Sequence, residues 1–191
     1  MPIVIEGPDN AGKSSLANDI ATRLGGLVIH AGPPVSDYSK MAKDIAQMDL
    51  DLANPEHRND VFDRAACISE SVYQNHCGAD DLALTGGIQR LLARDTILIY
   101  CRPPSSTLMD FSTHLTKAYD TEETMQKIVD NAHLYIERYD EVFSKIPHIN
   151  FSWIDAVDNK NWYNSFINAT VSYTRDMAAY KAVTEGFLNV R

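Results

Sequence analysis

Short apolar runs alternate with segments of helical periodicity along most of the chain. The runs have the length and composition of buried strands, and they lie at residues 2–6, 27–30, 61–63, 96–101 and 149–154. Elsewhere apolar side chains recur every three or four positions, which predicts helices at 16–24, 36–48, 64–76, 81–94, 122–145 and around 162–167. Gly86-Gly87 interrupts the fourth of these patterns. We also expect one or two helical turns at 105–111, a mobile lid loop at 112–121 and a weakly helical C-terminal extension at 174–191.

This alternation predicts a single α/β domain with a five-stranded parallel sheet that helices cover on both faces. In such sheets, ligands bind beyond the carboxyl ends of the strands. Polar residues follow all five predicted strands there, and they are Asp9, His30, Asp63 with Arg64, Arg102 and Asp155. We therefore expect these residues to lie around one site.

The first strand end carries a phosphate-binding pattern. The stretch from Gly7 to Ser14 fits G-x-x-x-x-G-K-S between a strand and a helix. The glycines let the backbone N–H groups curl toward phosphate oxygens, and the helix adds its positive N-terminal end. In this pattern Lys13 reaches the β- and γ-phosphates, and the Ser14 hydroxyl ligates Mg²⁺. The pattern predicts a P-loop, three-layer sandwich fold, against the simpler interpretation of a Gly-rich turn before a helix.

Composition narrows the class of partner. The 17 basic and 26 acidic side chains give a net charge of −9, which disfavours a long nucleic acid but not a small phosphorylated ligand. The cysteines Cys67, Cys77 and Cys101 lack disulfide or zinc spacing, so we expect reduced thiols in the cytoplasm. The N-terminus lacks the pattern of a signal peptide, and no apolar run is long enough to span a membrane.

With the P-loop and Asp63-Arg64 in place, the chain resembles the thymidylate kinase family of P-loop nucleoside monophosphate kinases, and above all its short, phage-type members. The resemblance covers about residues 1–155 and rests on three stretches. They are Ile5–Ser15, with an acidic residue at Asp9, Phe62-Asp63-Arg64 with Ile68–Gln74, and Ile154-Asp155-Ala156. The resemblance implies ATP- and Mg²⁺-dependent phosphorylation of a deoxynucleoside monophosphate, first dTMP or a related or modified pyrimidine nucleotide. It also implies a homodimer.

The resemblance further implies how the donor and the metal are held. Lys13 would hold the donor phosphates, and the metal ligands would come from Ser14, Asp63 and Asp9. The implied ATP site consists of Gly7, Asn10, Ala11, Gly12, Lys13, Ser14, Ser15 and Asp155. Phosphoryl transfer needs little covalent help and much placement of charge, which suits these residue types.

The implied acceptor site lies across from the P-loop. Arg64 would clamp the acceptor α-phosphate, a bidentate task that suits a guanidinium. Ser69 and Tyr73 are four residues apart and share one helix face, and in the family the Tyr lies under the sugar and excludes a 2′-hydroxyl. The implied substrate ligands are Asp9, His30, Asp63, Arg64, Ser69, Glu70 and Tyr73. The implied catalytic residues are Lys13, Arg64, Asp9 and Arg102.

The chain departs from the family in its arginines. Many members carry an Arg in the P-loop, where this chain has Asn10 and Ala11, or arginines in the lid, and here no Arg lies between Arg102 and Arg138. The cation that stabilises the transition state is therefore open, with Arg102, Arg138 and Lys117 as candidates.

Two further departures concern the acceptor. The family's Arg-Glu-Pro-Gly stretch is replaced by residues 30–34, which begin with His30. Glu70 stands where a neutral or amide residue is usual, and a carboxylate only accepts hydrogen bonds. The base of the acceptor is therefore open.

Simpler roles compete with several of these interpretations. Asp63 and Arg64 could form a helix N-cap and a surface ion pair, and Tyr73 could be a core residue. Asp155 could cap the next helix, His30 could be an ordinary loop residue, and Arg102 could simply follow the end of its strand. Two other functions also remain open. One is a nucleoside kinase or a kinase of a modified base within DNA, and the other is a non-catalytic nucleotide-binding regulatory protein.

Overall fold

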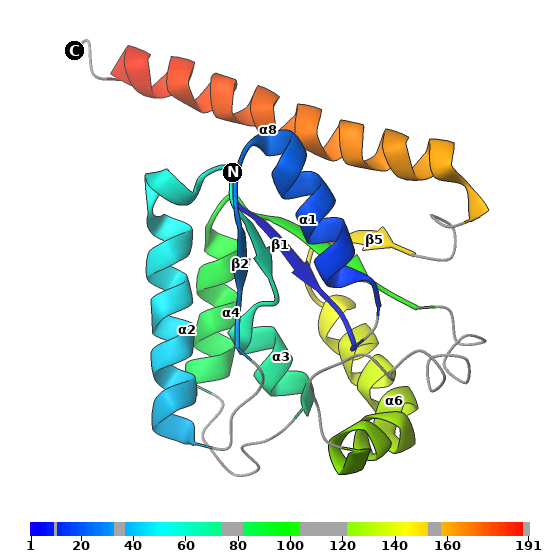
Figure 1. The fold of residues 1–191 in the computed structure, drawn as a ribbon. Coiled ribbons are helices and arrows are strands. Elements are labelled where there is room, and N and C mark those ends of the chain that lie inside the picture. Colours follow the sequence, from blue (N-terminus) through cyan, green and yellow to red (C-terminus); the bar gives the residue numbers. More distant parts are fainter. Residues whose placement is uncertain (10, 33–36, 74–81, 104–121, 153–157, 189–191) are drawn as a thin grey trace.

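A computed structural model describes residues 1–9, 11–32, 37–73, 82–103, 122–152 and 158–188 (Figure 1). Several predictions fall outside these residues: the helical turns at 105–111, the lid loop at 112–121, and the roles of Asn10, Cys77, Lys117 and Asp155.

The centre of the fold is a parallel five-stranded sheet with strand order β2-β3-β1-β4-β5. Its strands are β1 (Ile3–Glu6), β2 (Val28–His30), β3 (Val61–Asp63), β4 (Ile97–Cys101) and β5 (Ile149–Phe151). The α/β prediction with five parallel strands is confirmed. The central position of β1 places the loop that follows it between the ends of β3 and β4.

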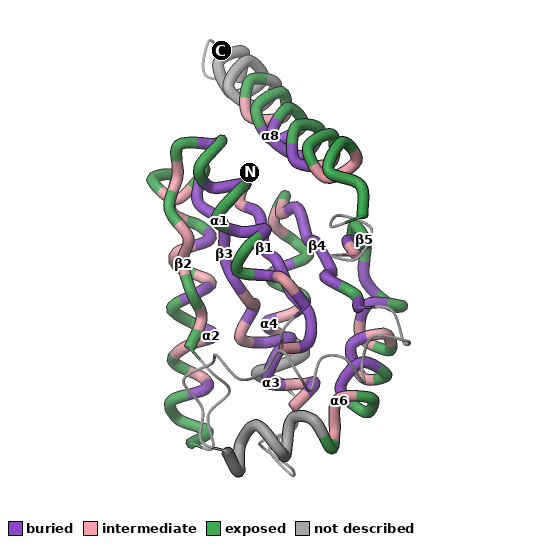
Figure 2. The backbone as a smooth tube through the Cα atoms, turned by 45° about the vertical axis from the view of Figure 1, so that its right-hand side comes forward, coloured by how far each residue is buried: buried purple, intermediate pink, exposed green. Residues whose placement is uncertain are grey.

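Helices cover both faces of the sheet (Figure 1). The elements outside the sheet are α1 (Lys13–Leu24), α2 (Tyr38–Ala53), the short 3₁₀ turn η1 (Pro55–His57), α3 (Ala66–Tyr73), α4 (Leu82–Ala93), α6 (Glu122–Phe143) and α8 (Lys160–Leu188). Alternate residues of β1 serve two separate cores. Ile3 and Ile5 pack with α1 and α8, whereas Val4 packs with the helices of the other face. Figure 2 shows the central strands buried and the outer sides of α2 and α8 exposed.

Gly86 and Gly87 lie inside α4 and do not interrupt it. A Cβ atom at Gly87 would lie 2.7 Å from the Cβ of Cys67 in α3 and 3.1 Å from a methyl of Ile45 in α2. The absence of a side chain thus lets α4 approach its two neighbours closely. Packing, not helix termination, explains this glycine.

The predicted helix around 162–167 is longer than expected at its C-terminal end. The helix around Trp162 and residues 174–188 form one continuous helix, α8, of 29 residues. Ile167, Val171 and Thr174 are buried at spacings of four and three residues, which aligns them on one side of α8. In Figure 1, α8 passes across the end of α1 and extends beyond it to Leu188. None of the described helices is long and apolar enough to cross a membrane.

Candidate active site

The loop after β1 depends on two glycines with positive φ. Gly7 has φ 147°, and a Cβ atom there would lie 2.3 Å from the backbone oxygen of Cys101 at the end of β4. Gly12 has φ 79° and is the N-cap of α1. The chain therefore passes against β4 and turns into α1 along a path that a side chain at Gly7 would block.

Lys13 lies inside this loop. Its side chain is almost completely buried, and its Nζ donates a hydrogen bond of 2.6 Å to the backbone oxygen of Pro8. Burial, followed by the charge of Arg64, lowers the pKa of Lys13 to about 8, although Asp9, Glu6 and Asp63 act in the opposite direction. Because the Lys13 ammonium group is so poorly solvated, an anionic ligand such as a phosphate would be a better partner for it than the Pro8 carbonyl oxygen.

Ser14 and Asp63 meet at the start of α1. The Ser14 hydroxyl donates to Oδ2 of Asp63 at 2.6 Å, and Nδ1 of the exposed His30 lies 3.1 Å from the same oxygen. Within the described residues, Oδ1 of Asp63 is buried and accepts no hydrogen bond. A buried carboxylate oxygen without a donor, next to a hydroxyl, fits Mg²⁺, which prefers oxygen ligands and completes its shell with phosphates and water. The described part of the chain holds no cluster of three or more His, Cys, Asp or Glu arranged as a metal site.

Arg64 faces the P-loop from the end of β3. It is a non-glycine residue with φ 84°, a conformation that costs free energy and is found preferentially at functional sites. Its guanidinium forms an ion pair with Asp9 of the P-loop, and the Tyr73 hydroxyl donates to the other Asp9 oxygen at 2.7 Å. Burial raises the pKa of Asp9, but the charges of Arg64 and Lys13 and the Tyr73 hydrogen bond outweigh it and hold that pKa below its usual value.

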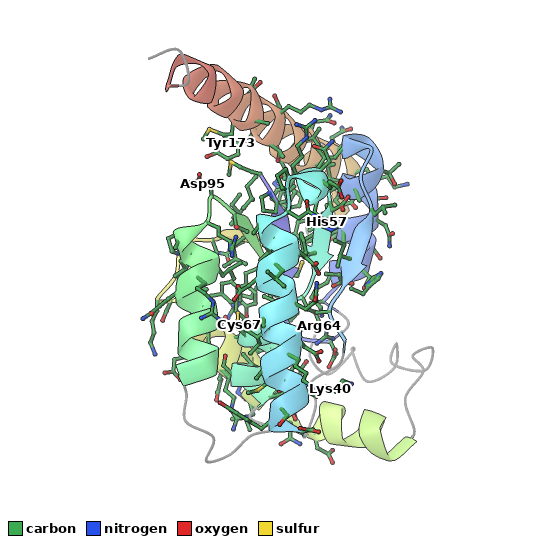
Figure 3. The ribbon with its side chains drawn as sticks, turned by 90° about the vertical axis from the view of Figure 1, so that its left-hand side faces the viewer. Lys40, His57, Arg64, Cys67, Asp95 and Tyr173 are labelled. Carbon is green, nitrogen blue, oxygen red and sulfur yellow. The ribbon has the colours of Figure 1, made fainter. Side chains whose placement is uncertain are left out.

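The structure thus brings Asp9, Arg64 and Tyr73 into one hydrogen-bonded group beside Lys13. In Figure 3, Tyr173 lies beyond His57, and Arg64 lies between His57 and Lys40, on the side of the sheet toward Lys40 and the start of α2. This is the carboxyl end of the sheet, where the strand-end pattern predicted a site.

Glu6 was not among the residues singled out from the sequence. It is completely buried, and it accepts hydrogen bonds from the backbone of Gly7 and Ala65 and from the hydroxyls of Ser69 and Tyr139. Ser69, predicted to bind substrate, is buried with its hydroxyl on Glu6. A carboxylate as the last residue of an otherwise apolar buried strand, Ile3–Glu6, is the signal that could have identified it.

The remaining predicted residues occupy varied positions. Arg102 donates two hydrogen bonds of 2.8 Å to Asp140 of α6 and is 43% exposed. Arg138 of α6 donates to the backbone oxygen of Val72 at 3.0 Å. Both candidate cations are therefore held by partners of their own. Of the others, Ala11 and Glu70 are buried, and Ser15 is exposed.

Comparisons with known proteins show a similarity of fold. No family model matches the chain, and no curated protein does. Among solved structures, the YorR protein of Bacillus subtilis in complex with phosphorylated GDP matches with a TM-score of 0.56 and 19% identity over 80% of this chain and 85% of that chain. Deoxyadenosine kinase of M. mycoides with bound dCTP matches with a TM-score of 0.49 and 18% identity over 90% of this chain and all of that chain. The chain therefore shares its α/β fold with the YorR structure. At these identities the likeness concerns the fold alone.

Proposed function

We propose that this protein transfers the γ-phosphoryl group of ATP to a deoxynucleoside monophosphate in a Mg²⁺-dependent reaction, with dTMP or a related or modified pyrimidine nucleotide as the first acceptor. One observation carries the proposal. Arg64, a partly buried cation in a strained backbone conformation, faces the P-loop and pairs with the loop's own Asp9. A cation suited to an acceptor phosphate thus lies next to the ligands of the donor phosphates. The YorR structure, which contains phosphorylated GDP, is consistent with a nucleotide site in this fold.

Each residue then has a task that matches its chemistry. Lys13 would exchange the Pro8 carbonyl for the β- and γ-phosphates, and Arg64 would hold the acceptor α-phosphate through two parallel N–H donors. Ser14 and Asp63 would hold Mg²⁺, which when bound neutralises charge on the donor phosphates. An oxygen of the acceptor phosphate forms a bond to the γ-phosphorus, the bond between that phosphorus and the bridging oxygen of ADP breaks, and ADP leaves.

An acceptor panel tests the proposal. The purified protein is incubated with ATP, Mg²⁺ and each deoxynucleoside monophosphate, modified pyrimidine nucleotides included, and diphosphate formation is measured by chromatography. We expect turnover of at least one pyrimidine nucleotide. ATP binding without transfer to any acceptor would instead support the regulatory nucleotide-binding protein.

A nucleoside acceptor is the second candidate, and the Asp9–Arg64 pair favours it. Asp9 already neutralises Arg64 and accepts the Tyr73 hydroxyl, so an uncharged 5′-hydroxyl could bind without displacing a carboxylate. Including deoxynucleosides in the same panel separates the two candidates. Faster transfer to a deoxynucleoside than to its monophosphate would replace the first candidate by the second.

Arg64→Ala tests the acceptor role. We expect the KM for the acceptor nucleotide to rise by about 10- to 100-fold, since a bidentate charged contact is lost, with the KM for ATP changing by less than about threefold. Arg90→Ala is the matched control, because Arg90 pairs with Asp49 between α2 and α4 and should leave both constants unchanged. A similar rise in both KM values for Arg64→Ala would contradict the assignment.

The pH dependence of ATP affinity tests the role of Lys13. With a pKa of about 8, Lys13 is charged below that pH and loses its proton above it, so ATP binding must then take up a proton. We expect the Kd for ATP to be flat from pH 6.5 to 7.5 and to rise above pH 8, by up to about tenfold per pH unit. Calorimetric titrations in buffers of different ionisation enthalpy would detect the proton uptake. In Lys13→Met the dependence should disappear.

A further inference from the structure

The most deeply buried charged group of the described residues is the carboxylate of Glu6, which lies between the P-loop and the residues around Arg64. Oε2 of Glu6 accepts from the backbone N–H of Gly7 at 3.0 Å and from the Tyr139 hydroxyl at 3.0 Å. Oε1 accepts from the backbone N–H of Ala65 at 2.6 Å and from the Ser69 hydroxyl at 2.7 Å. Four donors from three segments, the start of the P-loop, the start of α3 and the helix α6, therefore converge on one side chain.

These contacts determine what Glu6 can do. A carboxylate has about four acceptor positions, and here four donors occupy them. Its side chain has no exposed surface, so it meets neither solvent nor a ligand. Glu6 must act through the groups that it holds.

Hydrogen bonds to β1 hold the backbone on both sides of Arg64. The backbone N–H of Arg64 itself donates to the backbone oxygen of Ile5 at 2.9 Å, and the backbone N–H of the next residue, Ala65, donates to the Glu6 carboxylate. Both ends of the strained residue are thus fastened to β1 at adjacent positions. A φ of 84° is unfavourable for an arginine and persists only where its surroundings impose it. The Ser69 hydroxyl, one helical turn after Ala65, holds the same oxygen of Glu6 in place.

The other carboxylate oxygen connects α6. Tyr139 is completely buried, its ring stacks on Tyr100 with centroids 5.9 Å apart, and it meets the Tyr73 ring edge-on at 6.3 Å. Its hydroxyl therefore joins α6 to the end of β1, while the neighbouring Tyr73 donates its hydroxyl to Asp9.

We propose that Glu6 is a positioning residue of the active site: with Ser69 and Tyr139 it imposes the backbone conformation that aims Arg64 at the P-loop. Its consequence for catalysis rests on the proposed function, because only there does Arg64 bind an acceptor phosphate. The positioning itself is independent of the substrate.

Arginine modification tests the positioning without any substrate. Phenylglyoxal is added to the full chain, and the rate at which each arginine reacts is followed by peptide mass spectrometry. We expect Arg64 to react about threefold faster in Ser69→Ala and Tyr139→Phe, each of which removes one hydrogen bond to Glu6. In Glu6→Gln the increase should be about tenfold, because either orientation of the amide leaves one backbone N–H without an acceptor. Arg102 in the same sample should be unchanged.

Matched controls separate positioning from general loosening. Ser71→Ala removes another hydroxyl of α3, which donates to the backbone oxygen of Ile68. Tyr163→Phe removes a hydroxyl on the other side of the sheet, which donates to Asp19. Neither should change the reactivity of Arg64. If Ser69→Ala and Tyr139→Phe leave Arg64 at the rate of these controls, or if all arginines accelerate together, the proposal is overturned. These two milder variants decide the question even if Glu6→Gln does not fold.

Kinetics then connect positioning to the reaction. With the nucleotide that the acceptor panel identifies, Ser69→Ala should raise the acceptor KM about threefold, with the KM for ATP unchanged and no new pH dependence of kcat. If the profile of kcat against pH instead loses its acidic or its basic limb in this variant, Glu6 acts as a proton carrier and the proposal is overturned. If no acceptor turns over, the proposed function fails, and the reactivity of Arg64 still decides the positioning.

Discussion

Replacing Lys13 by methionine is expected to abolish phosphoryl transfer and to stabilise the folded protein in the same experiment. Lys13 supplies the only side-chain cation within the described P-loop, so kcat/KM should fall by at least about a thousandfold. Its burial holds its pKa at about 8, below the ordinary value of 10.5. At pH 7 the folded state therefore carries a charge that it disfavours, and methionine removes it.

The size and pH dependence of the stabilisation follow from this pKa. We expect the free energy of unfolding to rise by about 1–3 kcal/mol at pH 7. Because the pKa of Lys13 is lower in the folded than in the unfolded state, the unfolded state holds more protons between about pH 8 and 10.5. In this range the free energy of unfolding of the wild type therefore rises with pH relative to that of the variant. Urea unfolding at pH 7 and 9.5 measures both effects.

Lys145→Met is the matched control for Lys13→Met. Lys145 is exposed and pairs with Glu141 one turn earlier on the molecular surface, so activity should be unchanged and stability should shift by less than about 0.5 kcal/mol. If Lys13→Met destabilises the protein or retains activity, the buried P-loop lysine does not have the role assigned to it.

Gly7→Ala should have the largest effect on folding. The added Cβ would lie 2.3 Å from the backbone oxygen of Cys101, and a backbone atom of the central sheet cannot rotate away. The φ of 147° is itself unfavourable for alanine. We expect a loss of more than about 3 kcal/mol in the free energy of unfolding, with most of the protein insoluble.

Gly32→Ala is the control for Gly7→Ala, since a Cβ atom at Gly32 meets no atom of the described residues within 4 Å. Its stability should stay within about 0.5 kcal/mol of wild type. Soluble yield and the urea midpoint compare the two variants. A Gly7→Ala protein with the wild-type midpoint would refute the close passage of the loop against β4.

Local patterns were sufficient for most of the fold. The apolar runs identified the five strands, and the signal is clearest for β1 and β4, because a strand buried on both faces must be apolar at successive positions. The G-x-x-x-x-G-K-S spacing placed Lys13 and Ser14 at the start of α1 as predicted, because backbone geometry within a few residues determines that turn. The glycine pair of α4 was harder to interpret, since the reason for Gly87 is contact with Cys67 and Ile45 of two other helices.

For the candidate site, too, some features follow from the sequence and others from the tertiary structure. The sequence by itself determined that polar residues would gather at the carboxyl ends of the strands, and that a phosphate-binding loop would lie there, because chain direction and local spacing are properties of neighbours in sequence. The pairing of Asp9 with Arg64, of Arg102 with Asp140 and of Glu6 with Ser69 and Tyr139 depends on the tertiary structure. These partners are 38 to 133 residues apart, and only the packing of α3 and α6 against β1 and β4 brings their side chains within hydrogen-bond distance.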